Sequence, residues 1–276
     1  MSRFTFSVLV TVLALAPLAA AQEDEEKRDE GKKAPTAQEA IAQAKKALME
    51  ELSGQGIRID LDEKVIRFDA KICMDRGPAE YLLVGPGGAT HESLLISGIQ
   101  PSSLNAAIKA LGLKQGENVR YVKKDPPPSE EELKAGEPLY HIYPPEGDEL
   151  EIFLTWNADA QEKRHRAEEC ILNAVTEGPM PKTGWVYIAS RFVEVEPGAG
   201  EVFIADLERN IISIYQFEVR NSILVNPLRD GGYDDIWFAN PKLLPEVGTD
   251  VIVELRAPRK KGDDEKQDEG DEVGGK

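Results

Sequence analysis

The sequence predicts an α+β fold, in which a largely antiparallel sheet and about three helices form a single main domain. Segments in which apolar residues alternate with polar ones outnumber segments with helical spacing, and β-branched and aromatic residues favour strands in the second half. Strands and helices do not alternate regularly along the chain, which disfavours a doubly wound parallel sheet. We therefore expect one α+β domain over residues 37–257.

The first residues have the three parts of a secretory signal peptide. Arg3 supplies a positive charge, residues 4–18 are mostly apolar, and Ala19-Ala20-Ala21 matches the small-x-small cleavage pattern. The apolar run is interrupted by Pro17 and is shorter than the ~20 residues of a spanning helix. We expect residues 1–21 to be removed, export to the periplasm or the medium, and no membrane anchor after cleavage.

Two charged stretches flank the predicted domain. Residues 22–36 and 258–276 are rich in Asp, Glu, Lys and Arg and contain almost no large apolar side chains. Such segments bury too little apolar surface to offset the entropy of ordering. They are predicted to be a disordered linker and a disordered tail.

The first half of the predicted domain contains two helices and three strands. Thr36 and Glu39 form a capping-box pattern before a helix that ends at Gly54. Residues 57–72 alternate with period two on both sides of a short polar turn, which predicts a hairpin, and residues 80–84 predict a third strand. A second helix is expected from Pro101 to Gly112.

The second half contains one further long helix and mostly strands. Residues 119–122 and 150–156 predict strands, separated by a proline-rich stretch and a second capping box that begins at Ser129. Residues 164–175 have helical spacing. Further strands are expected at 185–190, 192–195, 201–205, 211–219 and 251–255.

Charge and cysteine content limit the function classes. The net charge of −17 and the absence of a basic stripe argue against binding to nucleic acid or anionic membranes. Cys73 and Cys170 could form a disulfide in an oxidising compartment, or could be two separate buried thiols, and their spacing does not decide. Two cysteines are too few for an iron–sulfur cluster with four cysteine ligands.

Several phrases, in order and spacing, resemble the YdjY-like domain family of bacteria. They include 72–73, 77–82, 90–95, 105–107, 111–113, 155–156, 184–190 and 203–206, and together they span about 57–226. The resemblance implies an exported bacterial domain of unsettled function. Ferredoxin-type labels are sometimes attached to this family, but this chain lacks the cysteines that such a reading requires.

The segment from Gly85 to Ser93 is the most suggestive place for chemistry. Its glycines precede His91 and Glu92, and no Lys-Ser/Thr pair follows them, so a phosphate-binding loop is disfavoured. His91 and Glu92 are candidate metal ligands or an acid/base pair. A metal site would need help from His141, Cys73 or Glu80, because adjacent side chains diverge. The alternative is structural: His91 bonds a backbone carbonyl and Glu92 caps the next segment.

These observations favour a non-catalytic extracytoplasmic module over an enzyme, with an unidentified protein or cell-envelope component as partner and no cofactor. The alternative is a metal-binding protein or metal-dependent hydrolase centred on His91 and Glu92. No strong zinc-binding spacing is present in the sequence, so the metal-binding hypothesis rests on His91 and Glu92. Thiol redox chemistry between Cys73 and Cys170 is a third hypothesis, although the Cys-x-x-Cys spacing is absent.

Overall fold

The computed structural model describes residues 36–158 and 160–258. The predicted signal peptide, most of the linker and most of the tail lie outside these residues. The chain divides into two compact units, Met1–Ile41 and Ala42–Lys276, and the fold described below belongs to the second. In the first, Thr36 and Glu39 form the predicted capping box: the Thr36 amide donates to Glu39 Oε2 (2.7 Å) and the Glu39 amide donates to Thr36 Oγ1 (3.2 Å).

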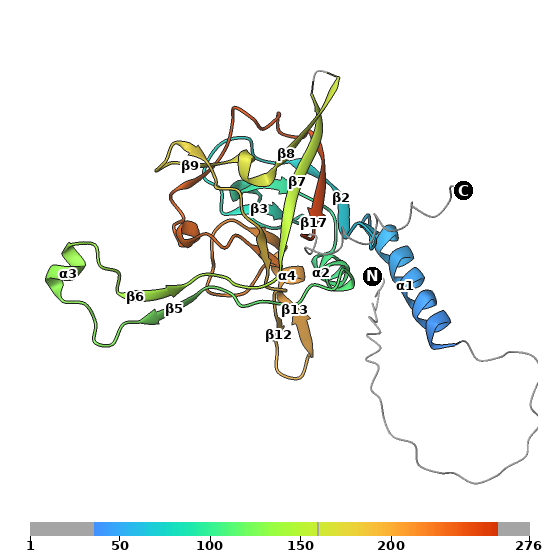
Figure 1. Cartoon of the computed structure of the whole chain (residues 1–276), viewed down its shortest axis with the longest axis horizontal. Helices are drawn as coiled ribbons and strands as arrows, with labels where there is room; N and C mark the ends of the chain where they lie inside the picture. Colours follow the sequence, from blue (N-terminus) through green and yellow to red (C-terminus); the bar gives the residue numbers. More distant parts are fainter. Residues whose placement is uncertain (1–35, 159, 259–276) are drawn as a thin grey trace, which may run out of the picture. The chain divides into compact units, whose positions relative to one another are not determined.

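Eight strands close into a β-barrel, and several of them are labelled in Figure 1. The predicted α+β fold, a largely antiparallel sheet with about three helices, was therefore wrong. Around the barrel the order is β2 (Val65–Ile72), β17 (Asp250–Arg256), β7 (Glu149–Ala158), β11 (Trp185–Tyr187), β15 (Leu224–Val225), β14 (Asn210–Ser213), β3 (Tyr81–Val84) and β4 (Ser93–Ile96). β14–β15 and β3–β4 are parallel, and the other six neighbouring pairs are antiparallel.

Closure depends on β2, which pairs with three strands. One edge of β2 follows β17 for seven residues. The other edge is divided, because residues 65–67 pair with β1 (Arg58–Asp60) whereas Lys71 and Ile72 pair with Ile96 and Leu95 of β4. Alternating side chains indicate which face of a strand is buried but not which strand lies at each edge. This is why the sequence pattern predicted the β1–β2 hairpin and not the closed barrel.

The barrel interior is filled by alternate side chains of its strands. In β7 the buried residues are Leu150, Ile152, Leu154 and Trp156, and the residues between them are only partly buried. The three tryptophans, Trp156, Trp185 and Trp237, are all buried.

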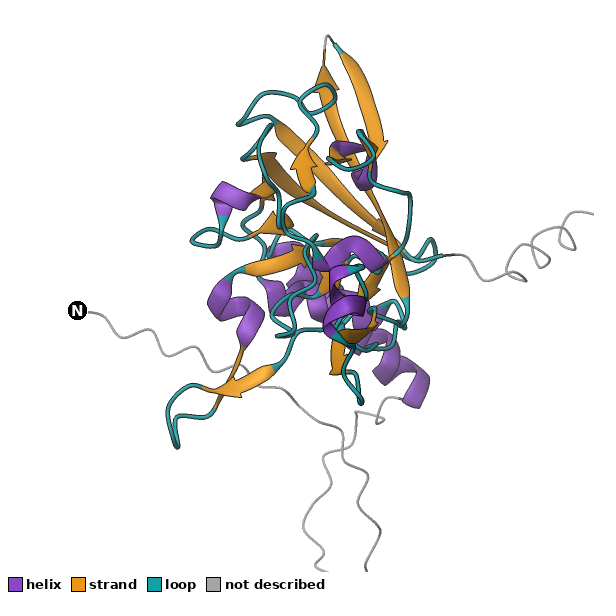
Figure 2. Cartoon of the chain, turned by 90° about the vertical axis from the view of Figure 1, so that its left-hand side faces the viewer, coloured by secondary structure: helices purple, strands orange, loops and turns teal. Residues whose placement is uncertain are grey.

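Strands dominate the regular structure (Figure 2), and four α-helices occur among the described residues instead of about three. They are α1 (Ala37–Gly54), α2 (Pro101–Ala110), α3 (Glu130–Lys134) and α4 (Ile204–Glu208). α2 buries Leu104, Ala107 and Ile108 in the core, and Asn105 accepts a 2.5 Å hydrogen bond from the Tyr187 hydroxyl. The capping box predicted at Ser129 is present at α3.

The helix predicted over residues 164–175 was wrong. The segment instead forms β8 (Gln161–Arg166), a 3₁₀ turn η2 (Ala167–Cys170) and β9 (Ile171–Asn173). β8 extends the sheet as a partner of β7, with Thr155 opposite Arg164 and Leu154 opposite His165. The apolar residues of this segment have helix-like spacing because Ala167, Cys170 and Ile171, in and just after the 3₁₀ turn, are all buried. Cross-strand pairing therefore overrode the local pattern.

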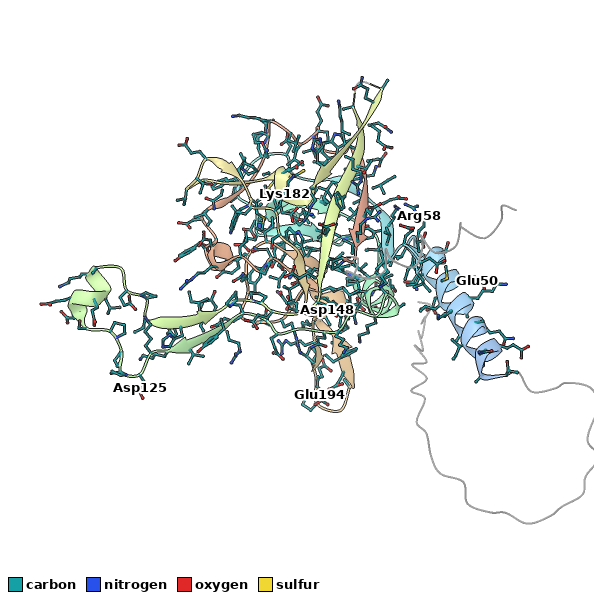
Figure 3. All side chains as sticks on the ribbon, in the orientation of Figure 1. Glu50, Arg58, Asp125, Asp148, Lys182 and Glu194 are labelled. Carbon is teal, nitrogen blue, oxygen red and sulfur yellow. The ribbon has the colours of Figure 1, made fainter. Side chains whose placement is uncertain are left out.

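Three small sheets lie outside the barrel. One contains β9, β10 (Gly178–Pro179) and β16 (Trp237–Ala239). The other two are two-stranded ribbons. β5 (Arg120–Lys123) and β6 (Tyr140–Tyr143) form an arm that carries α3, and β12 (Phe192–Glu194) and β13 (Glu201–Phe203) form a shorter hairpin. Figure 3 shows side chains pointing outward along both ribbons, with Asp125 labelled near the arm and Glu194 on the hairpin.

None of the helices in the described part of the chain is long and apolar enough to cross a bilayer.

Candidate functional site

Parallel pairing of β3 and β4 brings the predicted site residues together. Tyr81 lies opposite Ser93, so the residues just before the two strands, Glu80 and Glu92, become neighbours. The amide of Glu80 donates to the carbonyl of Glu92 at 2.9 Å. A 3₁₀ turn, η1 (Thr90–Glu92), carries His91 and Glu92 to this end of the barrel. Glu80, His91 and Glu92 therefore form one cluster, although Glu80 lies more than ten positions from the pair.

The glycine-rich loop before His91 is a compact turn. The Gly88 amide donates to the Gly85 carbonyl (3.0 Å), and the Gly85 amide donates to the Arg209 carbonyl (2.7 Å). A Cβ at Gly88 would lie 3.1 Å from the Gly85 carbonyl oxygen and from Val84 Cβ. The close approach of backbone to backbone explains the glycines without a ligand.

The Glu80 carboxyl is in an unfavourable electrostatic environment. Burial raises the pKa of Glu80, and the charges of Glu92 and Asp234 and a hydrogen bond with Glu92 raise this pKa further. The charge of His91 opposes these effects, but the net direction is upward. The carboxyl therefore holds its proton more tightly than an ordinary glutamate, because burial and the negative neighbours together outweigh the one histidine.

His91 lies at the edge of this cluster. Its side chain is 77% exposed, and Nε2 lies 3.6 Å from Glu92 Oε1. This is an exposed ion pair when the imidazole is protonated, and such pairs contribute little to stability. Across residues 36–158 and 160–258, no three His, Cys, Asp or Glu side chains are placed to hold a metal ion together.

The two cysteines are free thiols in different places. Cys73 follows β2, and its Sγ lies 3.0 Å from the Ser93 carbonyl, next to the cluster. Burial raises the pKa of the Cys73 thiol to about 11 and that of Cys170 to about 12. Because the thiolate is the nucleophile, both groups are poorly reactive at neutral pH.

The sequence analysis did not place the segment after β14 at this end of the barrel. The amides of Ile214 and Tyr215 both donate to the Glu80 carbonyl, at 2.7 and 2.9 Å, and this places the segment after β14 beside Glu80. The predicted strand over 211–219 is limited to Asn210–Ser213, and the residues that follow turn across the end of the barrel. The alternation of apolar and polar residues at Tyr215, Gln216 and Phe217 indicated an ordered segment, but it did not reveal which part of the chain this segment contacts.

Gln216 fixes the remaining loop of the site. Its amide donates to the Gly231 carbonyl (2.8 Å), and Nε2 donates to the carbonyls of Asn226 (2.9 Å) and Leu228 (2.7 Å). A Cβ at Gly231 would lie only 2.5 Å from Gln216 Nε2, so glycine is needed there. Asp234, which follows this loop, lies close enough to Glu80 for its charge to raise the Glu80 pKa. We call Glu80, Glu92, Tyr215, Phe217 and Asp234 together the Glu80 surface.

Comparison with known proteins identifies the family. The model of the YdjY domain matches residues 57–256 of this 276-residue chain, which covers the barrel and both ribbons. No curated protein and no solved structure matches the chain. The family match extends from β1 through β17, and the resemblance seen in the sequence is confirmed. The chain belongs to the YdjY domain family.

Proposed function

We propose that this protein is an exported, non-catalytic module that binds another protein or a component of the cell envelope. The observation that carries this proposal is the exposure of large apolar side chains on the two ribbons. Tyr143 on the arm is 44% exposed and Phe192 on the hairpin is 59% exposed, and Val122, Tyr140 and Val202 are exposed to a similar degree. Exposed apolar side chains gathered on projecting elements mark interaction surfaces.

Both ribbons also have unpaired strand edges. β5 pairs with β6, and β12 with β13, and none of the four pairs with another described strand. A two-stranded ribbon is marginally stable in water by itself, and its open edges can accept a further strand. A partner would cover the apolar side chains and satisfy the open edges together.

The Glu80 surface supports binding better than catalysis. Its nearest thiol, Cys73, has a raised pKa, and His91 is an exposed side chain beside a carboxylate. A nucleophile with an adjacent base would be expected for covalent catalysis, and these groups do not provide that arrangement. The metal-dependent alternative has no supporting ligand set among the described residues.

Site-specific photo-crosslinking in the living host tests the binding function. A photoreactive amino acid would replace Tyr143 or Phe192 in separate variants, and Glu162 on β8 would be the exposed control position. We expect the same discrete adduct mass from one or both ribbon positions and none from position 162. Absence of a discrete adduct at both ribbon positions would contradict the proposal.

Export is tested separately by fractionating the host and sequencing the amino terminus. We expect extracytoplasmic protein that begins at Gln22. A chain that keeps Met1 and stays with the cytoplasmic fraction would contradict export, whatever the crosslinking shows.

A further inference from the structure

Aromatic rings lie among the carboxylates of the Glu80 surface. The rings of Tyr81 and Phe217 stack with centroids 5.3 Å apart, and Tyr215 meets Phe217 edge-on at 4.6 Å. Burial raises the pKa of Tyr215, and the charges of Asp234, Glu80 and Glu218 raise it further, so these carboxylates lie around the phenol ring. Three carboxylates and three aromatic rings from different parts of the chain thus share one region.

The base of the arm extends this region. Tyr121 of β5 packs on the turn η3 (Arg229–Gly232), with its hydroxyl 2.5 Å from the position of a Cβ on Gly232. Burial raises the pKa of Tyr121, and Tyr215, Glu218 and Tyr233 raise it further. Tyr233 is 56% exposed. The Asn118 amide fixes the contact by donating to the carbonyls of Phe217 (2.8 Å) and Glu218 (3.1 Å).

Carboxylates dominate the charges that act on this region. Burial and the charges of Glu92 and Asp234 raise the pKa of Glu80, and His91 opposes them. The carboxylates of Glu218 and Asp234 also act on Tyr215. A complementary partner would bring positive charge. The ring faces are electron-rich and attract organic cations, and arginine stacks on them best because its guanidinium is planar.

We propose that the Glu80 surface binds an arginine side chain of a partner polypeptide. The guanidinium stacks on the exposed ring of Tyr233, which adjoins this surface, while its N–H groups donate to Glu80 and Asp234. This inference rests on the proposed binding function and specifies the chemistry of the partner. A metal ion fits the surface less well, because the phenyl and phenol rings between the carboxylates offer poor ligands to a hard cation.

Fluorescence anisotropy with defined peptides tests the proposal on the purified protein. The probe is a fluorescein-labelled peptide of alternating arginine and glycine, compared with lysine–glycine and glutamate–glycine peptides of equal length. We expect the arginine peptide to bind most tightly, the lysine peptide less tightly and the glutamate peptide not at all. The affinity should fall as salt is added, because the attraction is partly electrostatic.

Matched variants locate the binding site. Glu80→Gln/Asp234→Asn should weaken arginine-peptide binding about tenfold, and Tyr233→Ala about threefold. The control Glu51→Gln/Glu162→Gln removes the same net charge at exposed positions on α1 and β8 and should change the affinity less than about twofold. Thermal melting of each variant verifies that the fold is intact.

Three outcomes would overturn the inference. The first is an equal loss of arginine-peptide affinity in the control variant, and the second is no binding of the arginine peptide. The third is that millimolar Ca²⁺ fully displaces the arginine peptide from the wild type but not from Glu80→Gln/Asp234→Asn. Each is distinguishable from failure of the proposed function, which the ribbon crosslinks test independently. Discrete crosslinks at the ribbons without arginine-peptide binding would support the proposed binding module and contradict the arginine-binding role of the Glu80 surface.

Discussion

A buried glutamate, Glu254, and a partly buried one, Glu80, have opposite environments. Glu254 on β17 is surrounded by arginines: Arg67 of β2 lies 2.7 Å from Oε2, Arg164 of β8 lies 2.8 Å from Oε1, and Arg256 lies 3.1 Å from Oε1. Burial raises the pKa of Glu254, but hydrogen bonds from these arginines outweigh it and the net pKa is lowered. At Glu80, burial and two carboxylates raise the pKa.

The difference separates a structural charge from a charge that is free for a partner. Glu254 links its own strand, β17, to β2 and β8 through their arginines. It lies on the outer face of the barrel, since Val253 and Leu255 beside it are buried in the core. Its charge is satisfied within the chain. Glu80 lies where loops meet at the end of the barrel, and its negative neighbours leave the site short of positive charge. The presence of Glu254 is explained by its contribution to stability, whereas the presence of Glu80 is not.

The strongest prediction concerns the Glu254 network. Glu254→Gln leaves three arginines without their common counter-charge, and we expect the free energy of unfolding to fall by about 2–3 kcal/mol. The loss is smaller than for a fully buried pair because the arginine side chains are 27–42% exposed. Urea unfolding followed by tryptophan fluorescence measures it.

The matched substitution Glu80→Gln is the control for this prediction. It removes the same charge from a group repelled by its neighbours, so stability should stay constant or rise by about 0.5 kcal/mol. A loss comparable to that of Glu254→Gln would show that Glu80 has a stabilising partner and would remove the distinction between the two sites.

Thiol reactivity tests whether the Glu80 end of the barrel can perform chemistry. A pKa of about 11 instead of 9.0 lowers the thiolate fraction of Cys73 about a hundredfold at neutral pH. Iodoacetamide should therefore label native Cys73 slowly and the fully buried Cys170 more slowly still, as followed by mass spectrometry. Urea-unfolded protein provides the reference rate. Native labelling of Cys73 at that reference rate, or labelling that first needs a reductant, would contradict the free, unreactive thiols described above.

The pH dependence of stability should have opposite signs at the two glutamates. The folded pKa of Glu254 is lowered, so its contribution is present above the ordinary value of 4.5 and is lost as pH falls through the folded pKa. The folded pKa of Glu80 is raised, so its contribution is present below 4.5 and is lost as pH rises through the folded pKa.

Urea unfolding of the wild type and both glutamine variants, from about pH 3 to pH 8, measures this difference. The deficit of Glu254→Gln should shrink in acid. Any advantage of Glu80→Gln should be absent near pH 4.5 and grow toward neutral pH. Parallel profiles for the two variants would show that their environments are not opposite.

No change is expected from the metal test. Protein purified without chelator should contain no stoichiometric metal by elemental analysis, in the wild type, in His91→Ala and in the exposed control His141→Ala. Metal that is lost in His91→Ala and kept in His141→Ala would supply the missing positive charge at Glu80. The metal-binding hypothesis would then replace the binding module.

Local structure followed from local sequence where one segment carried the whole signal. The capping boxes at Thr36 and Ser129, the hairpin of β1 and β2, and the helix that begins at Pro101 are present as predicted. The helix predicted over 164–175 failed because β8 pairs with β7, and the spacing of Ala167 and Ile171 says nothing about that partner. For the site, the sequence indicated Glu80, His91 and Glu92 but did not place Asp234 or Tyr215 beside them.

The sequence by itself determined the family, the alternation that fills the core, the local turns and caps, and a short set of candidate residues. Only the tertiary structure decided that β2 is shared among β1, β4 and β17, which closes the barrel. It also decided which glutamate meets arginines and which meets other carboxylates. The reason is that side-chain periodicity specifies a face, whereas strand partners and charge neighbours depend on residues tens to hundreds of positions away.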